Sequence, residues 1–413
     1  MKKLALSLVT GLLTLSAQAA ITPVGNITSV TSSNAPNGTT VRIFGLSTGG
    51  AASVTPYAAD VIRVRFHFSG LWEKEEVMIA KPLEEWPATS GTFTDEGTHY
   101  RLATSELDVI IQKNPFKVDF KDKSGFMLLQ DGQMEYDPDY NFVGQRGTGS
   151  SKVKNLKVMP AGQAYFGLGE YGGPLNRRGR ELEVWTAGTY NWGEFQNPTY
   201  LNTPFFYGVQ PAAGSTPAFV YGILFNNPCR PLFKFGTQFG DRFSFEAGDG
   251  QLDYFFFGGG AAHTFAEVID RFSELTGRPT FLPKWGLGHQ LSRFSYDNQG
   301  WVEYIANEAT VRDIPLDAVY CDIDYMLYGP LGGGNIRQLT MNSNFPNPPG
   351  MISYCHARGV KVIPLIEPWL QPNDPLHGEA NGLFHFIKDN ASQTVTRNIY
   401  VGPVSWFDYT STA

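Results

Sequence analysis

The chain has 413 residues, of which 42% are hydrophobic and 17% charged, and its formal net charge is −7. The length exceeds that of a typical single domain, and the hydrophobic content is that of a folded protein with a large core. Because the net charge is negative and basic residues do not cluster beyond the N-terminus, the composition argues against nucleic acid as the main partner. The 45 glycines and 27 prolines, spread over many short segments, indicate a loop-rich β architecture.

Residues 1–19 have the pattern of a bacterial export signal. Two lysines precede an apolar stretch at residues 4–15, and Ala17-Gln18-Ala19 forms a small-x-small cleavage site. The apolar stretch is too short to span a membrane, and no later window is apolar enough. The sequence therefore predicts an exported protein, periplasmic or secreted, without a membrane anchor, whose mature chain begins near Ala20.

From about residue 20 to residue 262, short strands alternate with turns rich in Gly, Pro, Asn and Asp. Residues 61–68 alternate with a period of two, and residues 107–111 and 116–120 predict a hairpin around Asn114-Pro115. Further strands are expected at residues 218–225, 232–235 and 254–257. Many short strands in one stretch predict a large N-terminal β-sandwich domain over residues 20–262.

Within that stretch, residues 166–207 are glycine-rich at first and then aromatic, and their strand signals are weak. The aromatic side chains belong to Trp185, Tyr190, Trp192, Phe195 and Tyr200. Two interpretations stay open: a long loop that lines a binding site, or a loop that packs over the sandwich.

The pattern changes near residue 263, which starts the predicted second domain, residues 263–413. Helices are predicted at 264–276, 299–312 and 349–358, and strands at 285–290, 316–322 and 360–366. Alternation of strands and helices with short links is typical of a parallel α/β unit, either a barrel or a doubly wound sheet. From Trp369 to the C-terminus the pattern is irregular.

The strand at residues 316–321 is mostly apolar and is followed by two carboxylates, Asp322 and Asp324. Such a strand is expected to be buried on both faces of a parallel sheet. The C-terminal ends of strands are where (β/α)-barrels place their ligand contacts. The two side chains would share a face if the extended geometry continued. The alternative is that one Asp caps the next element and the other is solvated.

The chain from about residue 107 to residue 413 resembles glycoside hydrolase family 31, the α-glucosidase and α-xylosidase family, most strongly over residues 265–368. The resemblance rests on segments in the family's order: Phe166-Gly167-Leu168-Gly169-Glu170, residues 275–288, His289-Gln290 with Arg293 and Tyr296, residues 312–326, and Phe345-Pro346 with Gly359-Val360-Lys361-Val362 and Glu367-Pro368. It implies a galactose-mutarotase-like β-sandwich followed by an incomplete (β/α)8 TIM barrel.

The resemblance also implies the substrate-binding residues. Asp322 matches the carboxylate that binds sugar hydroxyls in the −1 subsite, and Glu367 stands where the family usually has Asp. The full set of expected substrate-binding residues is Asp322, Asp324, Glu367, Trp285, His289 and Arg293, of which Trp285 and Arg293 have barrel packing as the alternative role. The segment from Trp185 matches a family loop that often supplies an Asp, but it carries no carboxylate.

A retaining glycosidase needs a nucleophile and an acid/base carboxylate, about 5 Å apart. The family's Trp-x-Asp-Met-Asn-Glu-like nucleophile motif is absent from the chain, and residues 400–410 resemble the segment just before it. A complete barrel takes roughly 250 residues, about twice what the chain offers after residue 280. We therefore expect a C-terminally truncated sequence whose catalytic carboxylates lie beyond Ala413, and no glycosidase activity from the chain alone.

The predicted function is that of a retaining α-glycosidase acting on an oligosaccharide or α-glucoside substrate by hydrolysis of O-glycosyl bonds. The alternatives are an α-glucan transglycosylase of the same family and, from another class, a non-catalytic carbohydrate-binding protein. The seven histidines show no spacing typical of a metal site, so the sequence predicts no metal and no cofactor.

Overall fold

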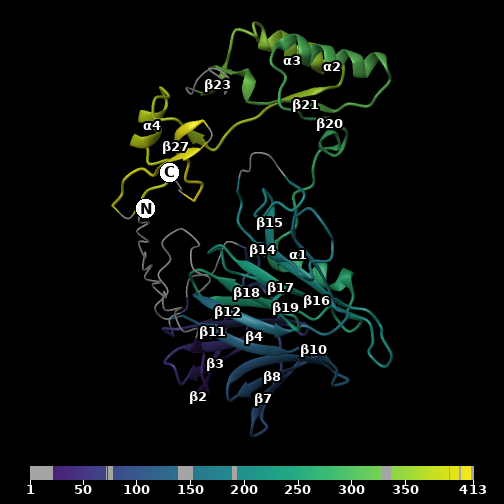
Figure 1. The fold of residues 1–413 in the computed structure, drawn as a ribbon, viewed down its shortest axis with the longest axis vertical. Helices are drawn as coiled ribbons and strands as arrows, with labels where there is room; N and C mark the ends of the chain where they lie inside the picture. The colour runs from purple at the N-terminus through teal and green to yellow at the C-terminus, as the bar shows by residue number, and fades with distance from the viewer. Residues whose placement is uncertain are drawn as a thin grey trace, which may run out of the picture. The chain divides into compact units, whose positions relative to one another are not determined.

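A computed structural model describes residues 22–70, 72, 78–137, 152–187, 193–327, 336–389, 391–399 and 401–410 (Figure 1). The chain divides into two compact units, Met1–Arg278 and Pro279–Ala413. The predicted export signal lies outside the described residues. Among the helices in the described ranges, none is long and apolar enough to cross a membrane.

The first unit is a β-sandwich whose largest sheet has eight antiparallel strands in the order β13-β15-β16-β19-β5-β4-β3-β2. Its strands are β2 (Ile27–Asn34), β3 (Thr40–Leu46), β4 (Ala51–Ala58), β5 (Val61–His67), β13 (Ala164–Gly169), β15 (Asn202–Gln210), β16 (Phe219–Phe225) and β19 (Leu252–Phe257).

Two smaller antiparallel sheets complete the sandwich. The six-stranded sheet, in the order β1-β11-β12-β18-β17-β14, contains β1 (Thr22–Pro23), β11 (Asp131–Tyr136), β12 (Val153–Val158), β14 (Glu181–Glu183), β17 (Leu232–Phe239) and β18 (Arg242–Ala247). The five-stranded sheet, β10-β9-β8-β7-β6, contains β6 (Thr92–Asp95), β7 (His99–Ala103), β8 (Leu107–Lys113), β9 (Phe116–Asp122) and β10 (Met127–Leu129).

Aromatic side chains fill the space between these sheets. Phe120 of the five-stranded sheet stacks on Phe256 of the eight-stranded sheet, with ring centroids 4.0 Å apart. Phe206 of the eight-stranded sheet meets Phe243 of the six-stranded sheet edge to face at 5.6 Å. All four rings are buried. The abundance of aromatic residues in the sequence is thus explained largely by this core.

The strands that the sequence predicts in this unit are confirmed. The predicted hairpin is β8 and β9, which pair antiparallel with Lys113 opposite Phe116. Residues 61–68, 218–225, 232–235 and 254–257 correspond to β5, β16, β17 and β19.

Helix α1 (Phe265–Thr276) belongs to the sandwich, which moves the domain boundary from the expected position at residue 263 to Arg278–Pro279. The helix begins with a capping box, in which Thr264 and Glu267 bond reciprocally. Its buried side chains, Val268 and Leu275, pack into an apolar cluster formed with strand residues of the sandwich. Because this apolar face needs a partner and finds it on β16 and β19, the helix stays with the first unit.

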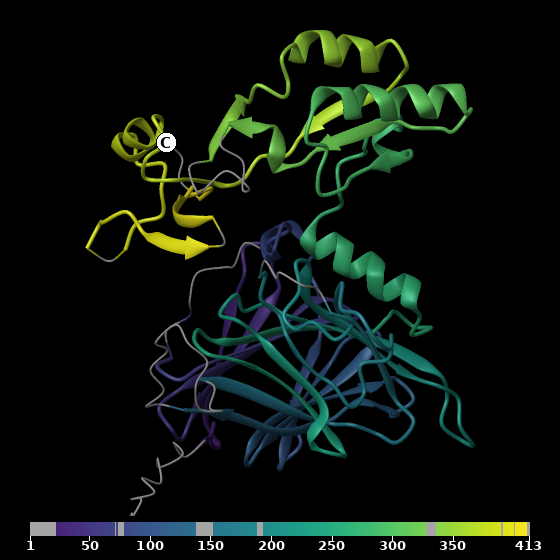
Figure 2. The ribbon, with the colours of Figure 1, turned by 45° about the horizontal axis from the view of Figure 1, so that its top comes forward.

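The second unit contains a three-stranded parallel sheet in the order β20-β21-β24, formed by β20 (Gln290–Leu291), β21 (Ala318–Cys321) and β24 (Lys361–Pro364). Helix α2 (Gln299–Val311) connects β20 to β21, and α3 (Pro348–His356) precedes β24. Figure 2 shows the two helices side by side along one face of this sheet. The predicted parallel α/β unit is therefore confirmed, and both helices lie where the sequence predicts them.

Two parts of the second unit differ from expectation. Residues 285–290 are not a continuous strand, because Lys284–Leu287 form a one-turn 3-10 helix, with Gly288 donating its N–H to the carbonyl of Trp285. The segment from Trp369 onward contains short regular elements: β25 (Trp369–Leu370), α4 (His377–Gly382), β26 (Thr396–Ile399) and β27 (Gly402–Trp406). A further pair, β22 (Met326–Leu327) and β23 (Arg337–Met341), is antiparallel.

Candidate active site

The carboxyl ends of β21 and β24 lie side by side at one edge of the parallel sheet. Cys321 stands opposite Pro364 in the register, and the N–H of Leu365 donates to the carbonyl of Cys321 at 2.9 Å. Asp322 directly follows β21, and Glu367 follows β24 by three residues. Both side chains are half-buried. The structure therefore brings two of the predicted substrate-binding carboxylates to the same edge of the sheet.

Asp322 is fixed by a local hydrogen bond. It caps the 3-10 helix η3 (Ile323–Tyr325), and its Oδ1 accepts from the N–H of Ile323 at 2.7 Å. The alternative interpretation, that one Asp caps the next element, thus describes Asp322 correctly. A single capping bond engages only part of the acceptor capacity of a carboxylate, which has room for about four hydrogen bonds.

Asp324 does not share a strand face with Asp322, because the extended geometry on which that expectation depended does not continue past Asp322. The extended backbone ends at Asp322, and Asp324 lies inside η3. The carbonyl of Asp324 accepts from Nδ2 of Asn342 at 2.6 Å. The carboxylate of Asp324 is half-buried. The turn of η3, and not the alternation of a strand, sets the direction of this side chain.

Residues that the sequence analysis did not single out fix the positions of these two chain segments, and one of them, Tyr325, joins the two directly. Tyr325 donates its hydroxyl to the carbonyl of Leu365 at 2.7 Å, and Asn342 donates its N–H to the carbonyl of Tyr325 at 2.9 Å. Gln338 accepts from the N–H of Glu367 at 2.8 Å. Tyr325 stands in the same short motif as the two aspartates, so its position in the sequence could have identified it. No feature of the sequence around Gln338 marks that residue.

Burial keeps Tyr325 and Cys321 protonated near neutral pH. It raises the pKa of Tyr325 to about 12, with Cys321 adding to the effect. Burial likewise raises the pKa of the Cys321 thiol to about 11, with Cys355 contributing. Near neutral pH the Tyr325 hydroxyl is therefore a permanent donor to Leu365, and Cys321 is a neutral, buried thiol rather than a nucleophile.

Trp285 and His289 lie at the other edge of the sheet. Both precede β20, whose first residue stands opposite Ala318, the first residue of β21. The Nδ1 atom of His289 lies 2.7 Å from the carbonyl oxygen of Pro315. The structure therefore does not bring these two side chains to the edge where Asp322 lies.

Arg293 follows β20 by two residues and so lies on the Asp322 side of the sheet. Its guanidinium carbon stands 5.2 Å from the ring centroid of Tyr296, and the Tyr296 side chain is buried. This is a packing contact within the second unit, and barrel packing is the alternative role that the sequence left open for Arg293.

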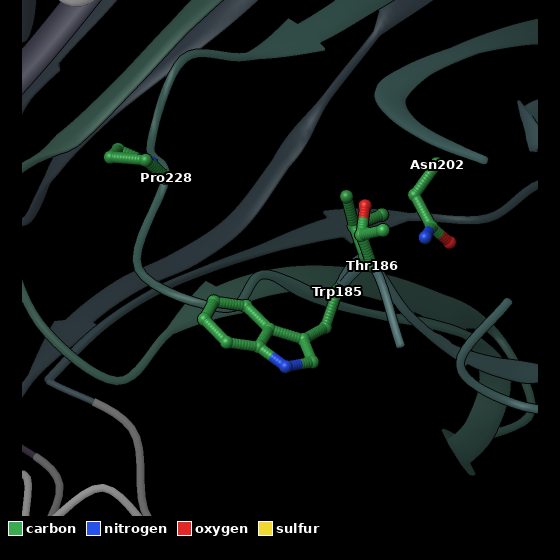
Figure 3. A pocket seen from close by; sticks show the side chains of 5 residues that line it. Trp185, Thr186, Asn202 and Pro228 are labelled. Carbon is green, nitrogen blue, oxygen red and sulfur yellow. The ribbon is translucent and has the colours of Figure 1, made fainter. Parts of the chain in front are cut away.

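A separate hollow of about 250 Å³ opens in the first unit (Figure 3). It is lined by Val184, Trp185, Thr186, Asn202 and Pro228. Trp185 is 46% exposed and lines this hollow.

Polar contacts fix two sides of this hollow. The guanidinium of Arg230 stands 5.5 Å from the Trp185 ring centroid and pairs with Glu183. Asn202 accepts from the Tyr171 hydroxyl at 2.6 Å and donates to the carbonyl of Thr199 at 2.7 Å. Tyr190 and Trp192, from the same aromatic stretch, lie outside the described residues.

Among the residues that the structure describes, no group of three or more His, Cys, Asp and Glu side chains could hold a metal ion. The chemistry that the candidate site offers is hydrogen bonding by carboxylates at the end of a buried strand. Such groups bind and orient the hydroxyls of a polar ligand.

Comparisons with known proteins match both units. The domain described as "Glycosyl hydrolase 31 N-terminal galactose mutarotase-like domain" matches residues 51–233, and the domain described as "Glycosyl hydrolases family 31 TIM-barrel domain" matches residues 279–413.

The chain is 29% identical to an alpha-glucosidase 2 of Bacillus thermoamyloliquefaciens over 358 residues, which are 86% of this chain and 41% of that protein. It is 27% identical to an isomaltosyltransferase of Sporosarcina globispora, covering 66% of this chain and 26% of that protein. Its structure is similar to that of a GH31 dextranase of Flavobacterium johnsoniae complexed with glucose, with a TM-score of 0.76, 26% identity, and coverage of 94% of this chain and 44% of that one. The chain thus spans less than half the length of these relatives.

Proposed function

The chain belongs to glycoside hydrolase family 31, and from this premise we propose that it contributes the sugar-positioning site of an exported retaining α-glycosidase. The substrates proposed are α-linked oligosaccharides and α-glucosides. The family supports the reaction class, and the pattern of residues 1–19 supports export to the periplasm or the medium.

One observation carries this proposal: Asp322 is held at the carboxyl end of β21, beside the end of β24. In (β/α)-barrels that end of the strands is where ligands bind. A carboxylate fixed there accepts hydrogen bonds from sugar hydroxyls and so orients the ring relative to the reacting bond. Glu367, at the same edge, is the second candidate for such contacts.

The proposed reaction is a double displacement through a covalent glycosyl-enzyme, which needs a nucleophile and an acid/base carboxylate. The chain contains no Trp-x-Asp-Met-Asn-Glu-like motif, so we assign neither role to one of its residues. Asp322 is a positioning residue in this scheme. We accordingly propose that the 413-residue chain does not turn over a glycoside by itself.

Hydrolysis and transfer share the same first step, and the acceptor distinguishes them. The relatives include proteins named for each outcome, an alpha-glucosidase and an isomaltosyltransferase. Water accepts the glycosyl group in hydrolysis, whereas a sugar hydroxyl accepts it in transfer. The residues discussed above orient the donor sugar, which both outcomes require.

The test is to assay the purified chain and the product of the complete reading frame that contains it with an aryl α-glucoside, maltose and isomaltose. We expect turnover only when a Trp-x-Asp-Met-Asn-Glu-like segment is present in the product. Turnover by the 413-residue chain itself would contradict the proposed division of roles. Absence of turnover by a product that contains the segment would contradict the proposed activity.

A second candidate function, carbohydrate binding without catalysis, is favoured by the exposed Trp185 in its hollow (Figure 3). An exposed indole offers an apolar face on which a sugar ring can stack. The test is calorimetric titration with isomaltotriose, whose signal does not depend on the Trp185 indole. Binding that is lost in Trp185→Ala and kept in Phe239→Ala, which also removes an exposed ring, would support this function. Binding that is unchanged in Trp185→Ala would exclude it.

A further inference from the structure

A second hollow in the sandwich, of about 220 Å³, is lined by other strands than the hollow at Trp185. Its lining includes Thr40 and Arg42 of β3, Leu102 of β7, and Thr89 and Ser90 of the loop before β6. Because side chains alternate along a strand, Thr40 and Arg42 share the face of β3 that carries the core residue Phe44. Thr40, Arg42 and Thr89 are half-buried and Ser90 is exposed, so the hollow opens at the border between the core of the sandwich and the solvent.

The guanidinium of Arg42 has no anionic partner among the described residues. Its Nη1 donates to the hydroxyl oxygen of Ser32 at 2.5 Å. Its Nε is shielded from solvent and makes no hydrogen bond with any group that the structure describes. Burial lowers the pKa of Arg42, and no carboxylate offsets that effect. A partly buried cation without a counter-charge is costly, which points to a ligand.

The Arg42 side chain is held in place by aromatic rings. Its guanidinium carbon stands 4.6 Å from the ring centroid of Phe93. Phe93 is itself stacked on Tyr100, with centroids 5.1 Å apart and an interplanar angle of 17°. This platform restricts the guanidinium before any ligand arrives, so less entropy is lost on binding.

The other polar groups of the hollow are mostly engaged. The Thr40 hydroxyl donates to Asn34 at 3.1 Å, and the Thr89 hydroxyl donates to the carbonyl of Tyr57 at 3.1 Å. Ser90 adds an exposed hydroxyl at the rim. Among the described residues, no Asp or Glu lines the hollow. The hollow thus offers a cation and a hydroxyl, which together suit an acceptor ligand.

We propose that this hollow binds a small oxyanion, such as a carboxylate or phosphate group, on the guanidinium of Arg42. Arginine recognises the oxygen atoms of an anion through a planar fork of N–H donors. Ser90 contributes a further donor at the rim. The oxyanion can come from free phosphate or from an acidic sugar, and the site is independent of the proposed glycosidase activity.

The test is calorimetric titration of the whole chain at low ionic strength with inorganic phosphate and with D-glucuronate, using D-glucose as the neutral control. We expect saturable one-to-one binding of at least one of the two anions and none of glucose. Arg42→Gln should weaken that binding at least about tenfold, since charge-assisted bonds are lost. Binding of phosphate alone would identify the free anion as the ligand, and stronger binding of glucuronate would identify an acidic sugar.

The matched control is Arg101→Gln, which removes the same charge from β7. Arg101 pairs with Glu96 and, by alternation, faces away from Leu102 and the hollow. The Arg101→Gln variant should bind the anions as tightly as the unmodified chain does. Because Arg42→Gln could impair folding, Ser90→Asp is the second variant: it adds a negative charge at the rim of the hollow, which should weaken anion binding. Absence of anion binding, equal binding of glucose, or unchanged binding in folded Arg42→Gln or Ser90→Asp would overturn the proposal.

Discussion

The hydroxyl of Tyr325 donates a hydrogen bond to the carbonyl oxygen of Leu365 at 2.7 Å. This bond joins the turn after β21 to the segment after β24. These are the two segments that carry Asp322 and Glu367. The Tyr325 side chain is buried, so the bond is shielded from water. The relative position of the two carboxylates thus depends on a contact made by a neighbouring residue.

Replacing Tyr325 with Phe should lower the free energy of unfolding of the second unit by about 0.5–1.5 kcal/mol, the net value of one hydrogen bond. Urea denaturation measures the change. Tyr304→Phe, which removes an exposed hydroxyl from α2, is the control and should stay within about 0.5 kcal/mol of the unmodified chain. Equal effects of the two substitutions would show that the Tyr325 bond contributes nothing specific.

A buried ion pair in the sandwich gives a second prediction. Lys157 of β12 pairs with Asp131 of β11, both side chains are fully buried, and Lys157 also donates to the Tyr254 hydroxyl at 2.8 Å. Lys157→Met leaves Asp131 as a buried charge without its cation, so it should destabilise the first unit by about 3–5 kcal/mol. Chemical denaturation measures this loss.

The control for that experiment is Lys123→Met, which breaks a pair with Asp108 at the surface. The Lys123 side chain is 42% exposed, and solvent screens the pair, so the expected cost is below about 1 kcal/mol. A Lys157→Met variant as stable as Lys123→Met would contradict the role given to the buried pair.

A third prediction concerns pH. Burial raises the pKa of Asp119 above its ordinary value of 3.8, and the neighbouring Asp131 raises it further. The folded state therefore holds this proton more tightly than the unfolded state. Stability from this group is present at low pH and is lost as the pH rises from about 3.8 through the raised pKa.

Asp119→Asn removes this titration. Relative to the unmodified chain, the variant should therefore gain free energy of unfolding as the pH rises through that window. Urea denaturation at several pH values, from about 4 to about 7, measures the difference. A difference that is independent of pH, or that falls as pH rises, would contradict the assigned direction.

The helices α2 and α3 and the strand β21 of the second unit were predictable because local signals mark them. Asn298 and Asn347 cap α2 and α3, and the apolar run before Asp322 forms β21. The 3-10 helix at Lys284–Leu287 was not predicted, because its apolar residues resemble a strand. The turn at Asp324 was also missed, because the two-residue period of a strand does not indicate where the extended backbone ends.

The candidate site was predictable only in part. The resemblance placed Asp322 and Glu367, which lie at one edge of the sheet, but it also included Trp285 and His289, which lie at the other. Contacts between distant segments, such as Tyr325 with Leu365 or Lys157 with Asp131, leave no mark in the local pattern. A lysine in a strand is expected to face solvent until its buried partner is known.

The most direct test of the central claim is the effect of Asp322→Asn on kcat/KM for an aryl α-glucoside, measured on the product of the complete reading frame that contains this chain. Asp313→Asn is the matched control, because Asp313 is exposed in the turn before β21 and has a positive φ of 54° that Asn tolerates. We predict that Asp322→Asn lowers kcat/KM by about a hundredfold or more, as expected for loss of a positioning residue, while Asp313→Asn leaves it unchanged. Equal activity of the two variants would contradict the assignment of Asp322 as the sugar-positioning carboxylate.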